Sequence, residues 1–243
     1  GKIAMKLIDG DSLVGVVPCR ENDDILLSAS LGKCMRFRSN DVRLFKGRGS
    51  IGVRGIRLKK EDYVISISVL KHIEADTDIK TLYLKAAGAK RRGDAQDYIE
   101  EEQFELMNND DQFILTISEN GFGKRTSAYE YRITNRGGQG IINIETSERN
   151  GPVIGSFLVE DSDDVMLVTN AGRMIRSPVN DIRIASRNTQ GVTLFSIDKG
   201  EKVVSVTAIS AVEDEQNENL DKESEEINDS DDVSIDKEDN KDE

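Results

Sequence analysis

The sequence is short of the residues that most catalytic and metal sites use. Its 243 residues include two cysteines, Cys19 and Cys34, and one histidine, His72. Two cysteines cannot form the disulfide framework of a small secreted protein, and we expect both to be reduced thiols packed inside a cytosolic protein. A structural zinc site needs about four ligands at close spacing, and this inventory does not supply them.

A Ser–His–Asp or Cys–His catalytic set would have to use His72. This histidine lies in the polar stretch KHIEADTD (71–78), which contains no nucleophile motif. We therefore expect it to be an exposed loop residue. Long apolar runs are missing as well: none approaches the ~20 residues that span a membrane, and no signal-peptide pattern is present.

Negative charge is concentrated at one end of the chain. Residues 213–243 contain 16 acidic and 3 basic residues, a net charge of −13 that equals the net charge of the whole chain. Residues 1–212 are therefore balanced, with 30 acidic and 30 basic residues. The end segment has too few apolar residues to bury a core, so we expect a disordered acidic tail. Such a tail either only raises solubility or competes with nucleic acid for a basic surface.

The body of the chain contains an internal repeat. Three segments align: DDILLSASLGKCMRFR (23–38), DQFILTISENGFGKRTSA (111–128) and DDVMLVTNAGRMIRSP (163–178). Each has an apolar, strand-like run, then a glycine turn, then a second strand that carries cations. The turn glycine is followed four residues later by an arginine: Gly32 and Arg36, Gly121 and Arg125, Gly172 and Arg176.

A second glycine anchors each unit 19 or 20 residues after the first. These anchors are Gly52, Gly140 and Gly191, and Gly1 fits the same register, so that successive anchors are 51, 88 and 51 residues apart. The long step contains an insertion of roughly 37 residues in or near 71–109. Further apolar strands close the units: LVGVVP (13–18), YVISISVL (63–70), PVIGSFLV (152–159) and KVVSVTAI (202–209).

A unit of about 51 residues with four short strands is typical of a propeller blade. One unit cannot bury both faces of its sheet, so neighbouring units must stack. The prediction is an all-β, propeller-like fold of four-stranded blades. Its segments are a blade end (1–22), a blade (23–70), a probable helical insertion (71–109), two further blades (110–159 and 160–212) and the tail (213–243).

The insertion differs in character from the blades. TDIKTLYLKAAGAKRRG (77–93) and DAQDYIEEEQFELMNN (94–109) are rich in good helix formers, and Asp94 is a plausible N-cap. We expect two helices that project from one blade. The alternative is an elaborated surface loop without function.

The loops before the second anchors carry the candidate binding residues. They are LFKGRGSIG (44–52), RITNRGGQG (132–140) and RIASRNTQG (183–191). A glycine-rich loop beside a cation can cradle a phosphate, and it can equally be a plain turn before a strand. Cations recur in these loops at Lys46, Arg48, Arg136 and Arg187, and in the preceding strands at Arg36, Arg38, Lys124, Arg125, Arg173 and Arg176. If the strand side chains point outward, these cations line one edge of a disc; alternatively they only guard solubility.

Several motifs occur in the order and spacing of a known family. GVRGIRL (52–58), NGFGKRTSAYEY (120–131), RGGQGII (136–142) and RNTQGV (187–192) resemble the C-terminal domain of DNA gyrase A. The resemblance runs from Gly1 to about Ser210, and the acidic tail fits it too. The chain is less similar to the equivalent protein of topoisomerase IV, whose repeats are more degenerate and whose tail is usually not acidic.

The resemblance implies a β-pinwheel, a disc of six blades in which adjacent blades exchange strands and a basic rim bends DNA around the disc. This chain would carry the last three blades and the end of the one before. The family's Q-R-R-G-G-K-G box belongs to the absent first blade. TNRGGQG (134–140) matches it at Arg136, Gly137, Gly138 and Gly140 and departs from it at three positions, so it resembles a degenerate internal copy.

The resemblance also implies the partners and what the chain lacks. Double-stranded DNA is the expected ligand, and the expected DNA-binding residues are the ten loop and strand cations named above with Gly137 and Gly138. The rest of gyrase A, together with gyrase B, would complete a heterotetramer that hydrolyses ATP as a type II topoisomerase in the bacterial cytoplasm, on the chromosome and not at a membrane. The catalytic tyrosine, ATP and Mg²⁺ would lie elsewhere, so no catalytic residue, metal or cofactor is expected here.

Two other classes of function remain open at this point. A protein-binding propeller would show an apolar or aromatic patch in place of a basic rim. A hydrolytic propeller would need clustered carboxylates near a central pocket, and the sequence offers only repeated pairs such as Asp23–Asp24 and Asp163–Asp164, which are most simply turn formers.

Overall fold

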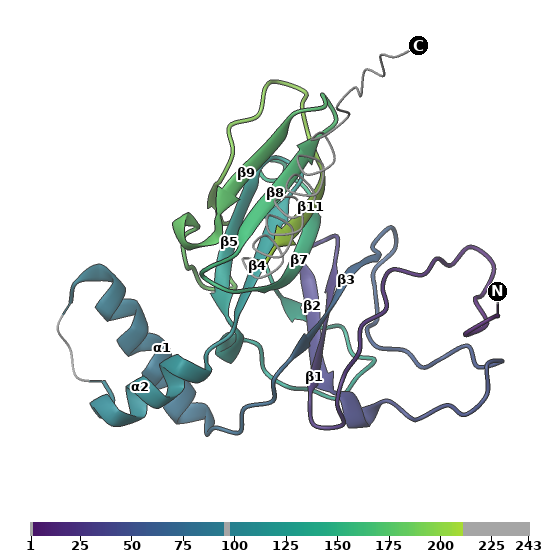
Figure 1. Ribbon diagram of the computed structural model, residues 1–243, viewed down its shortest axis with the longest axis horizontal. Coiled ribbons are helices and arrows are strands. Elements are labelled where there is room, and N and C mark those ends of the chain that lie inside the picture. Colours follow the sequence, from purple (N-terminus) through teal and green to yellow (C-terminus); the bar gives the residue numbers. More distant parts are fainter. Residues whose placement is uncertain (1, 95–97, 211–243) are drawn as a thin grey trace, which may run out of the picture.

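The computed structural model describes residues 2–94 and 98–210, and it is built mainly of antiparallel sheets (Figure 1). Three sheets follow one another along the chain, and two helices project from the side of the first and second sheets. The predicted all-β pinwheel with a helical insertion is confirmed for these residues. The predicted acidic tail, 213–243, lies outside the described residues.

The first two sheets have four strands each. The first contains β1 (Asp24–Ala29), β2 (Lys33–Arg38), β3 (Val64–Leu70) and β6 (Ile141–Ile142), in the order β3-β1-β2-β6. The second contains β4 (Phe113–Ser118), β5 (Phe122–Ser127), β7 (Val153–Val159) and β10 (Val192–Thr193), in the order β10-β5-β4-β7. Each is built on a tight hairpin whose turn holds a glycine at positive φ, Gly32 or Gly121.

The third sheet has three strands within the described residues. It contains β8 (Asp164–Thr169), β9 (Met174–Pro178) and β11 (Val203–Ile209), in the order β11-β8-β9. A short 3-10 helix follows the second strand of every unit: η1 (Ser39–Asp41), η2 (Ala128–Glu130) and η3 (Val179–Asp181). After η2 and η3 the chain returns to the preceding sheet, where Ile133 forms a bridge with Arg36 and Ile184 with Arg125.

Adjacent units exchange a strand. β6 belongs by sequence to the second unit but pairs with β2 of the first, with Cys34 opposite Ile141. β10 of the third unit pairs in the same way with β5 of the second, with Gly123 opposite Val192. The fourth strand of the first and second sheets therefore comes from the following unit, and within the described residues no such strand pairs with the third sheet.

The same rule explains why two segments that align with strands of later units form no strand themselves. GVRGIRL (52–58) aligns with β6, so its partner would be the second strand of a preceding unit, and residues 2–22 supply no such hairpin. The predicted strand at 13–18 is not formed either. Its apolar side chains are exposed, with Leu13 at 60% and Val16 at 80%.

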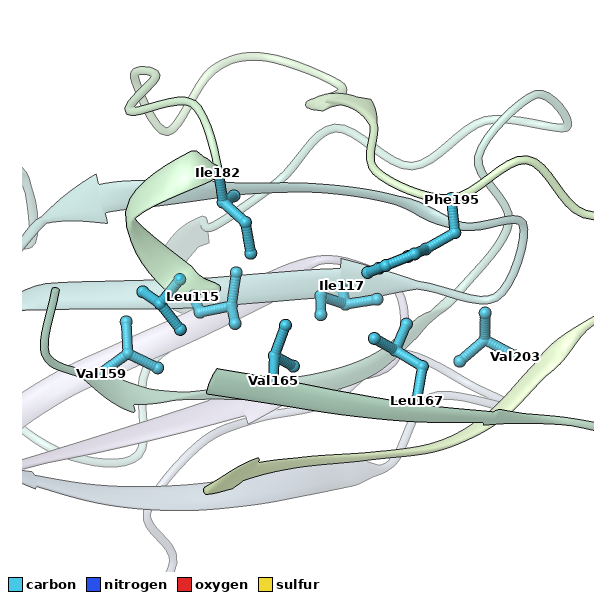
Figure 2. Packing of buried hydrophobic residues seen from close by; sticks show 9 residues of the cluster. Leu115, Ile117, Val159, Val165, Leu167, Ile182, Phe195 and Val203 are labelled. Atoms are coloured by element: carbon cyan, nitrogen blue, oxygen red, sulfur yellow. The ribbon is translucent and has the colours of Figure 1, made fainter. Parts of the chain in front are cut away.

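The hydrophobic core lies between stacked sheets. Leu115 and Ile117 of β4 face Val165 and Leu167 of β8, and Phe195 closes the end of the cluster (Figure 2). β8 alternates buried and partly buried residues because one of its faces is covered more completely than the other. β4 is buried along nearly its whole length because sheets pack on both of its faces.

The insertion folds as a helical hairpin of α1 (Thr77–Arg92) and α2 (Glu101–Asp110). α1 begins at the N-cap Asp76, whose carboxylate accepts from the Asp78 N–H at 2.8 Å, and ends at Gly93 in the left-handed conformation. Tyr83 of α1 anchors the hairpin, with its ring 5.2 Å from that of Tyr129 beside the second sheet.

Three smaller expectations from the sequence are corrected. Asp94 is not a helix N-cap, because α2 begins only at Glu101; its carboxylate instead accepts from Nε of Arg92 at 3.0 Å. Of the two cysteines only Cys34 is packed inside, where burial raises the pKa of its thiol to about 12, whereas Cys19 is exposed. The third correction, at His72, concerns the site below.

Candidate nucleic-acid interface

Two of the three repeat arginines of the second strands, Arg36 and Arg125, point into the molecule, whereas Arg176 is exposed. The side chain of Arg36 is 6% exposed, and its Nε and Nη2 donate to Oδ2 of the buried Asp24 at 2.9 and 2.7 Å. Its Nη1 donates to the carbonyl oxygen of Ala128 at the start of η2, 2.7 Å away. Arg36 therefore joins the first sheet to the second unit.

Arg125 makes the equivalent connection one unit later. Its Nε donates to the carbonyl oxygen of Ile182 at 2.8 Å and its Nη2 to that of Asn180 at 3.1 Å, both at η3, and Nη1 pairs with Asp161. Phe113 occupies the place of Asp24, and its ring centroid lies 5.8 Å from the guanidinium carbon. The buried side chain of Arg125 thus joins the second sheet to the third unit, as Arg36 joins the first sheet to the second unit.

The loop arginines hold the exchanged strands in place. Arg136 donates from Nε to the carbonyl oxygen of Asp41 at 3.0 Å and from Nη1 to that of Arg54 at 3.2 Å. Arg187 donates to the matching carbonyl oxygens one unit later, those of Glu130 at 2.9 Å and Ile142 at 2.5 Å. Arg48 aligns with both and is exposed.

The glycine-rich loop at 135–140 is a packing turn. Gly137 has φ +82°, and its N–H donates to the carbonyl oxygen of Gly55 at 2.5 Å, while the carbonyl oxygen of Gly138 accepts from the Arg57 N–H at 2.7 Å. A Cβ on Gly140 would overlap the carbonyl oxygen of Cys34. The glycines therefore let the exchanged strand approach its neighbour, and the Gly137 amide is already paired within the protein.

Lys124 is the most deeply buried cation among residues 2–94 and 98–210. Its side chain is fully enclosed, and Nζ donates to the carbonyl oxygens of Ser186 and Arg187 at 2.5 and 2.7 Å and to the Thr189 hydroxyl at 3.2 Å. Burial lowers the pKa of Lys124 to about 8. This lysine fixes the loop that precedes the exchanged strand β10.

His72 is not an exposed loop residue. Its side chain is 12% exposed, with Nδ1 3.1 Å from both carboxylate oxygens of Asp24 and Nε2 2.6 Å from Nη2 of Arg38. The guanidinium of Arg38 can only donate, so the tautomer that fits carries its proton on Nδ1 and donates it to Asp24. His72 and Arg38 thus complete the polar cluster around Arg36.

The expected interface residues therefore separate into three groups. Those whose side chains are exposed are Lys46, Arg48, Arg173 and Arg176. Partly buried positions are Arg38, Arg136, Gly137, Gly138 and Arg187. Arg36, Lys124 and Arg125 are buried. The interpretation of these last three as DNA contacts required outward side chains, and that condition is not met.

The exposed cations are themselves partly paired with carboxylates. Arg173 lies 2.8 Å from Glu201, whose pKa is held below its usual value by the Thr169 hydroxyl and other donors. Nε of Arg176 lies 2.5 Å from Asp164. Asp163 accepts from the Glu160 N–H and so forms a turn, as expected. Asp164 instead pairs with Arg176.

A second set of arginines repeats on the surface and was not singled out from the sequence. Arg43, Arg132 and Arg183 each stand two residues after a 3-10 helix, are spaced like Arg36, Arg125 and Arg176, and are exposed. Among the residues described, none of the three forms a salt bridge. The repeat spacing alone could have found them, because each follows its strand arginine by seven residues.

The family model for the DNA gyrase C-terminal domain, a beta-propeller, matches residues 1–20, 23–71, 112–160 and 163–210. The chain belongs to this gyrase C-terminal domain family. The matched segments coincide with the repeat units, and the helical insertion falls in the unmatched stretch 72–111.

Curated relatives of the chain are gyrase A proteins. It is 47% identical over 237 residues to the DNA gyrase A of Granulibacter bethesdensis, covering 88% of this chain and 25% of that protein. It is 45% identical over 229 residues to the gyrase A of Rickettsia bellii, covering 90% and 25%, and 36% identical over 216 residues to that of Escherichia coli, covering 89% and 20%. The chain thus spans about a quarter of the length of the relatives it matches.

Solved structures agree on the fold of this gyrase family. A DNA gyrase A C-terminal domain matches with a TM-score of 0.63 at 21% identity, covering 86% of this chain and 58% of that one. The C-terminal domain of a DNA topoisomerase IV matches with a TM-score of 0.58 at 19% identity, covering 79% and 48%. No helix within residues 2–94 and 98–210 is long and apolar enough to cross a membrane, and the same residues hold no cluster of metal-binding side chains.

Proposed function

We propose that this chain binds duplex DNA without sequence preference and wraps it, as the C-terminal module of a DNA gyrase A. One observation carries the proposal: Arg43, Arg132 and Arg183 repeat once per unit, are exposed, and have no carboxylate partner among the described residues. We add the exposed loop cations Lys46 and Arg48 to this set and call the five the rim cations.

The inward arginines give the rim its regular geometry. Arg36, Arg125, Arg136 and Arg187 each bind carbonyl groups of a neighbouring unit, so successive units are held at a fixed spacing and angle. A rim cation placed once per unit then meets the DNA backbone at regular intervals. Contacts of this kind position DNA without reading its sequence.

The energy of wrapping comes from charge. Duplex DNA carries one phosphate charge per ~1.7 Å of helix axis, and each neutralised phosphate releases counterions. Bending 20–30 base pairs smoothly by 40–90° costs about 1–6 kcal/mol, and a curved row of cations offsets this. Within a gyrase, wrapping would fix the handedness of the bound DNA segment. ATP-driven strand passage would then introduce negative supercoils.

The remaining parts of that reaction belong to other segments. DNA cleavage, ATP and Mg²⁺ would be handled by the rest of gyrase A and by gyrase B in a cytoplasmic heterotetramer. This chain would contribute the wrapped DNA segment. The proposal rests on the family and on the rim cations.

DNA binding as a function of salt tests the proposal. We expect the affinity of the full chain to fall steeply between 50 and 200 mM salt and to be equal for unrelated duplex sequences. Replacing Arg43, Arg132 and Arg183 together by alanine should reduce the slope of log K against log salt by about 2.7, since each phosphate contact contributes about 0.9.

A matched control separates this effect from loss of net charge. Lys71, Lys90 and Lys202 are exposed but already paired with Asp110, Glu105 and Glu119. Their triple alanine variant loses the same formal charge and should keep most of the wild-type slope. Equal slopes for the two triple variants would contradict the proposed interface.

A further inference from the structure

A hollow of about 680 Å³ lies between helix α1 of the insertion and the segment around η2 of the second unit. Five cations line it: Arg36, Lys80, Lys85, Arg132 and Arg187. Its one lining carboxylate is that of Glu130, which already accepts from the Arg187 N–H at 2.9 Å. The hollow is therefore strongly cationic.

The charge comes partly from one face of α1. Thr77, Lys80, Thr81, Leu84 and Lys85 line the hollow, and their spacing of three and four residues places them along one side of a helix. The residues that pack on α2 and the second unit lie on another face of α1, as Tyr83 and Ala87 show. Asp78 of α1 is outside the hollow, so the face toward it carries only neutral and basic side chains.

Most of these five cations have no salt-bridge partner in the described part of the chain. Lys80, Lys85 and Arg132 form no salt bridge with any described residue, whereas Arg36 is paired with Asp24. Lys80 is half-buried, and burial together with the charge of Arg36 lowers the pKa of its ammonium, although the nearby carboxylates of Asp24, Asp76 and Glu74 act in the opposite direction. Unpaired like charges gathered in a hollow repel one another unless an anion binds between them.

The hollow is continuous with the proposed DNA path. Arg132 is a rim cation and also lines this hollow, and it lines a second hollow of about 300 Å³ between β2 and the loop 134–141. Lys80 and Lys85 are about 7.5 Å apart along the helix axis at 1.5 Å per residue. Two lysines at this separation can each contact a different phosphate of the DNA backbone.

We propose that the groove between α1 and the second unit binds backbone phosphates of the duplex that lies on the rim, with Lys80 and Lys85 as the ligands supplied by the insertion. The inference rests on the proposed function and adds a contact that lies outside the residues matched by the family model. The helical insertion then adds DNA contacts beside Arg132 and is not a surface loop without function.

Charge substitutions on one helix test this assignment. The double variant Lys80→Ala, Lys85→Ala should reduce the salt slope of duplex binding by about 1.8. The control Lys90→Ala, Arg92→Ala removes two cations from the same helix that are paired with Glu105 and Asp94, and it should leave the slope within a few tenths of wild type. Lys80→Gln, Lys85→Gln repeats the test with side chains of greater length if the alanine variant melts early.

Chemical modification of lysines in the wild-type chain is a second test, and it needs no substitution. Acetylation of Lys80 and Lys85 by a soluble reagent should fall at least fivefold when duplex DNA saturates the chain, while Lys59 and Lys60, in an exposed turn elsewhere, keep their reactivity. Inorganic phosphate at millimolar concentration should protect neither lysine of α1. Equal protection by inorganic phosphate would overturn the assignment to a DNA backbone.

The outcomes separate the two proposals. If the wild-type chain binds DNA with a steep salt dependence and Lys80 and Lys85 stay reactive in the complex, the groove assignment is wrong and the rim proposal stands. If the wild-type chain does not bind duplex DNA at all, both are overturned.

Discussion

The guanidinium of Arg36 donates to the carbonyl oxygen of Ala128 across a distance of 2.7 Å, although the two residues are 92 positions apart. Arg36 stands on the second strand of one unit, and Ala128 begins the 3-10 helix of the next. Arg125 repeats the contact at η3. These two arginines join neighbouring units through hydrogen bonds. The free energy of unfolding should therefore depend on them.

Replacing Arg36 by methionine should lower the free energy of unfolding by about 3–5 kcal/mol, because it leaves the buried carboxylate of Asp24 without its guanidinium partner. Arg176→Met is the matched control. Its aligned ion pair with Asp164 is partly exposed, and such pairs contribute about 0–1 kcal/mol. Urea unfolding of both variants measures the difference, and equal losses would contradict the role assigned to Arg36.

Two glycines at positive φ should respond differently to alanine. Gly140 and Gly172 have φ of +70° and +81°, so alanine strains the backbone at both by about 1–2 kcal/mol. At Gly140 the new methyl also overlaps the carbonyl oxygen of Cys34, whereas at Gly172 nothing lies within 4 Å. Gly140→Ala should therefore destabilise by about 1–3 kcal/mol more in thermal unfolding; equal losses would refute the close approach of the exchanged strand.

The buried Lys124 predicts a pH dependence. Its folded pKa is about 8, below the ordinary value of 10.5, so between these pH values the folded state binds fewer protons than the unfolded state. The contribution of Lys124 to the free energy of unfolding should therefore rise from pH 8 to 10.5. The difference between wild type and Lys124→Met in urea unfolding should grow in favour of wild type over this window; a constant difference would argue against a buried, depressed lysine.

The acidic segment 213–243 gives a prediction from charge alone. A tether keeps its 16 acidic residues at millimolar effective concentration near the body, so they should compete with DNA for cations. Removing the segment should tighten duplex binding at low salt, and the effect should fade as salt screens charges over ~8–10 Å. Coinciding titrations of residues 1–212 and the full chain at low salt would leave the segment as a solubiliser only.

The sequence predicted the fold better than the site. The repeat, its glycine anchors and the helical insertion are all local patterns, and each is present in the structure. The direction of the strand cations is not local. β2 is buried on nearly every residue because neighbouring units cover it, and Arg36 finds its carbonyl partner 92 residues away.

The surface arginines were missed for a related reason. Arg132 and Arg183 begin two of the candidate loops and Arg43 directly precedes the third, but the cations nearer the anchor glycines, such as Arg136 and Arg187, were chosen in their place. Only alignment by the repeat period shows that they are equivalent, and only the structure shows that they are exposed while Arg36 and Arg125 are not.

The central claim is that the rim cations wrap DNA, and the linking number of closed circular DNA tests it most directly. Circles are relaxed by a nicking-closing enzyme with increasing amounts of the full chain, and their topoisomers are then resolved without protein. We expect a shift in linking number of one sign that grows with the amount of bound chain and is largely lost in the Arg43→Ala, Arg132→Ala, Arg183→Ala variant. An unchanged topoisomer distribution at saturating chain would contradict wrapping.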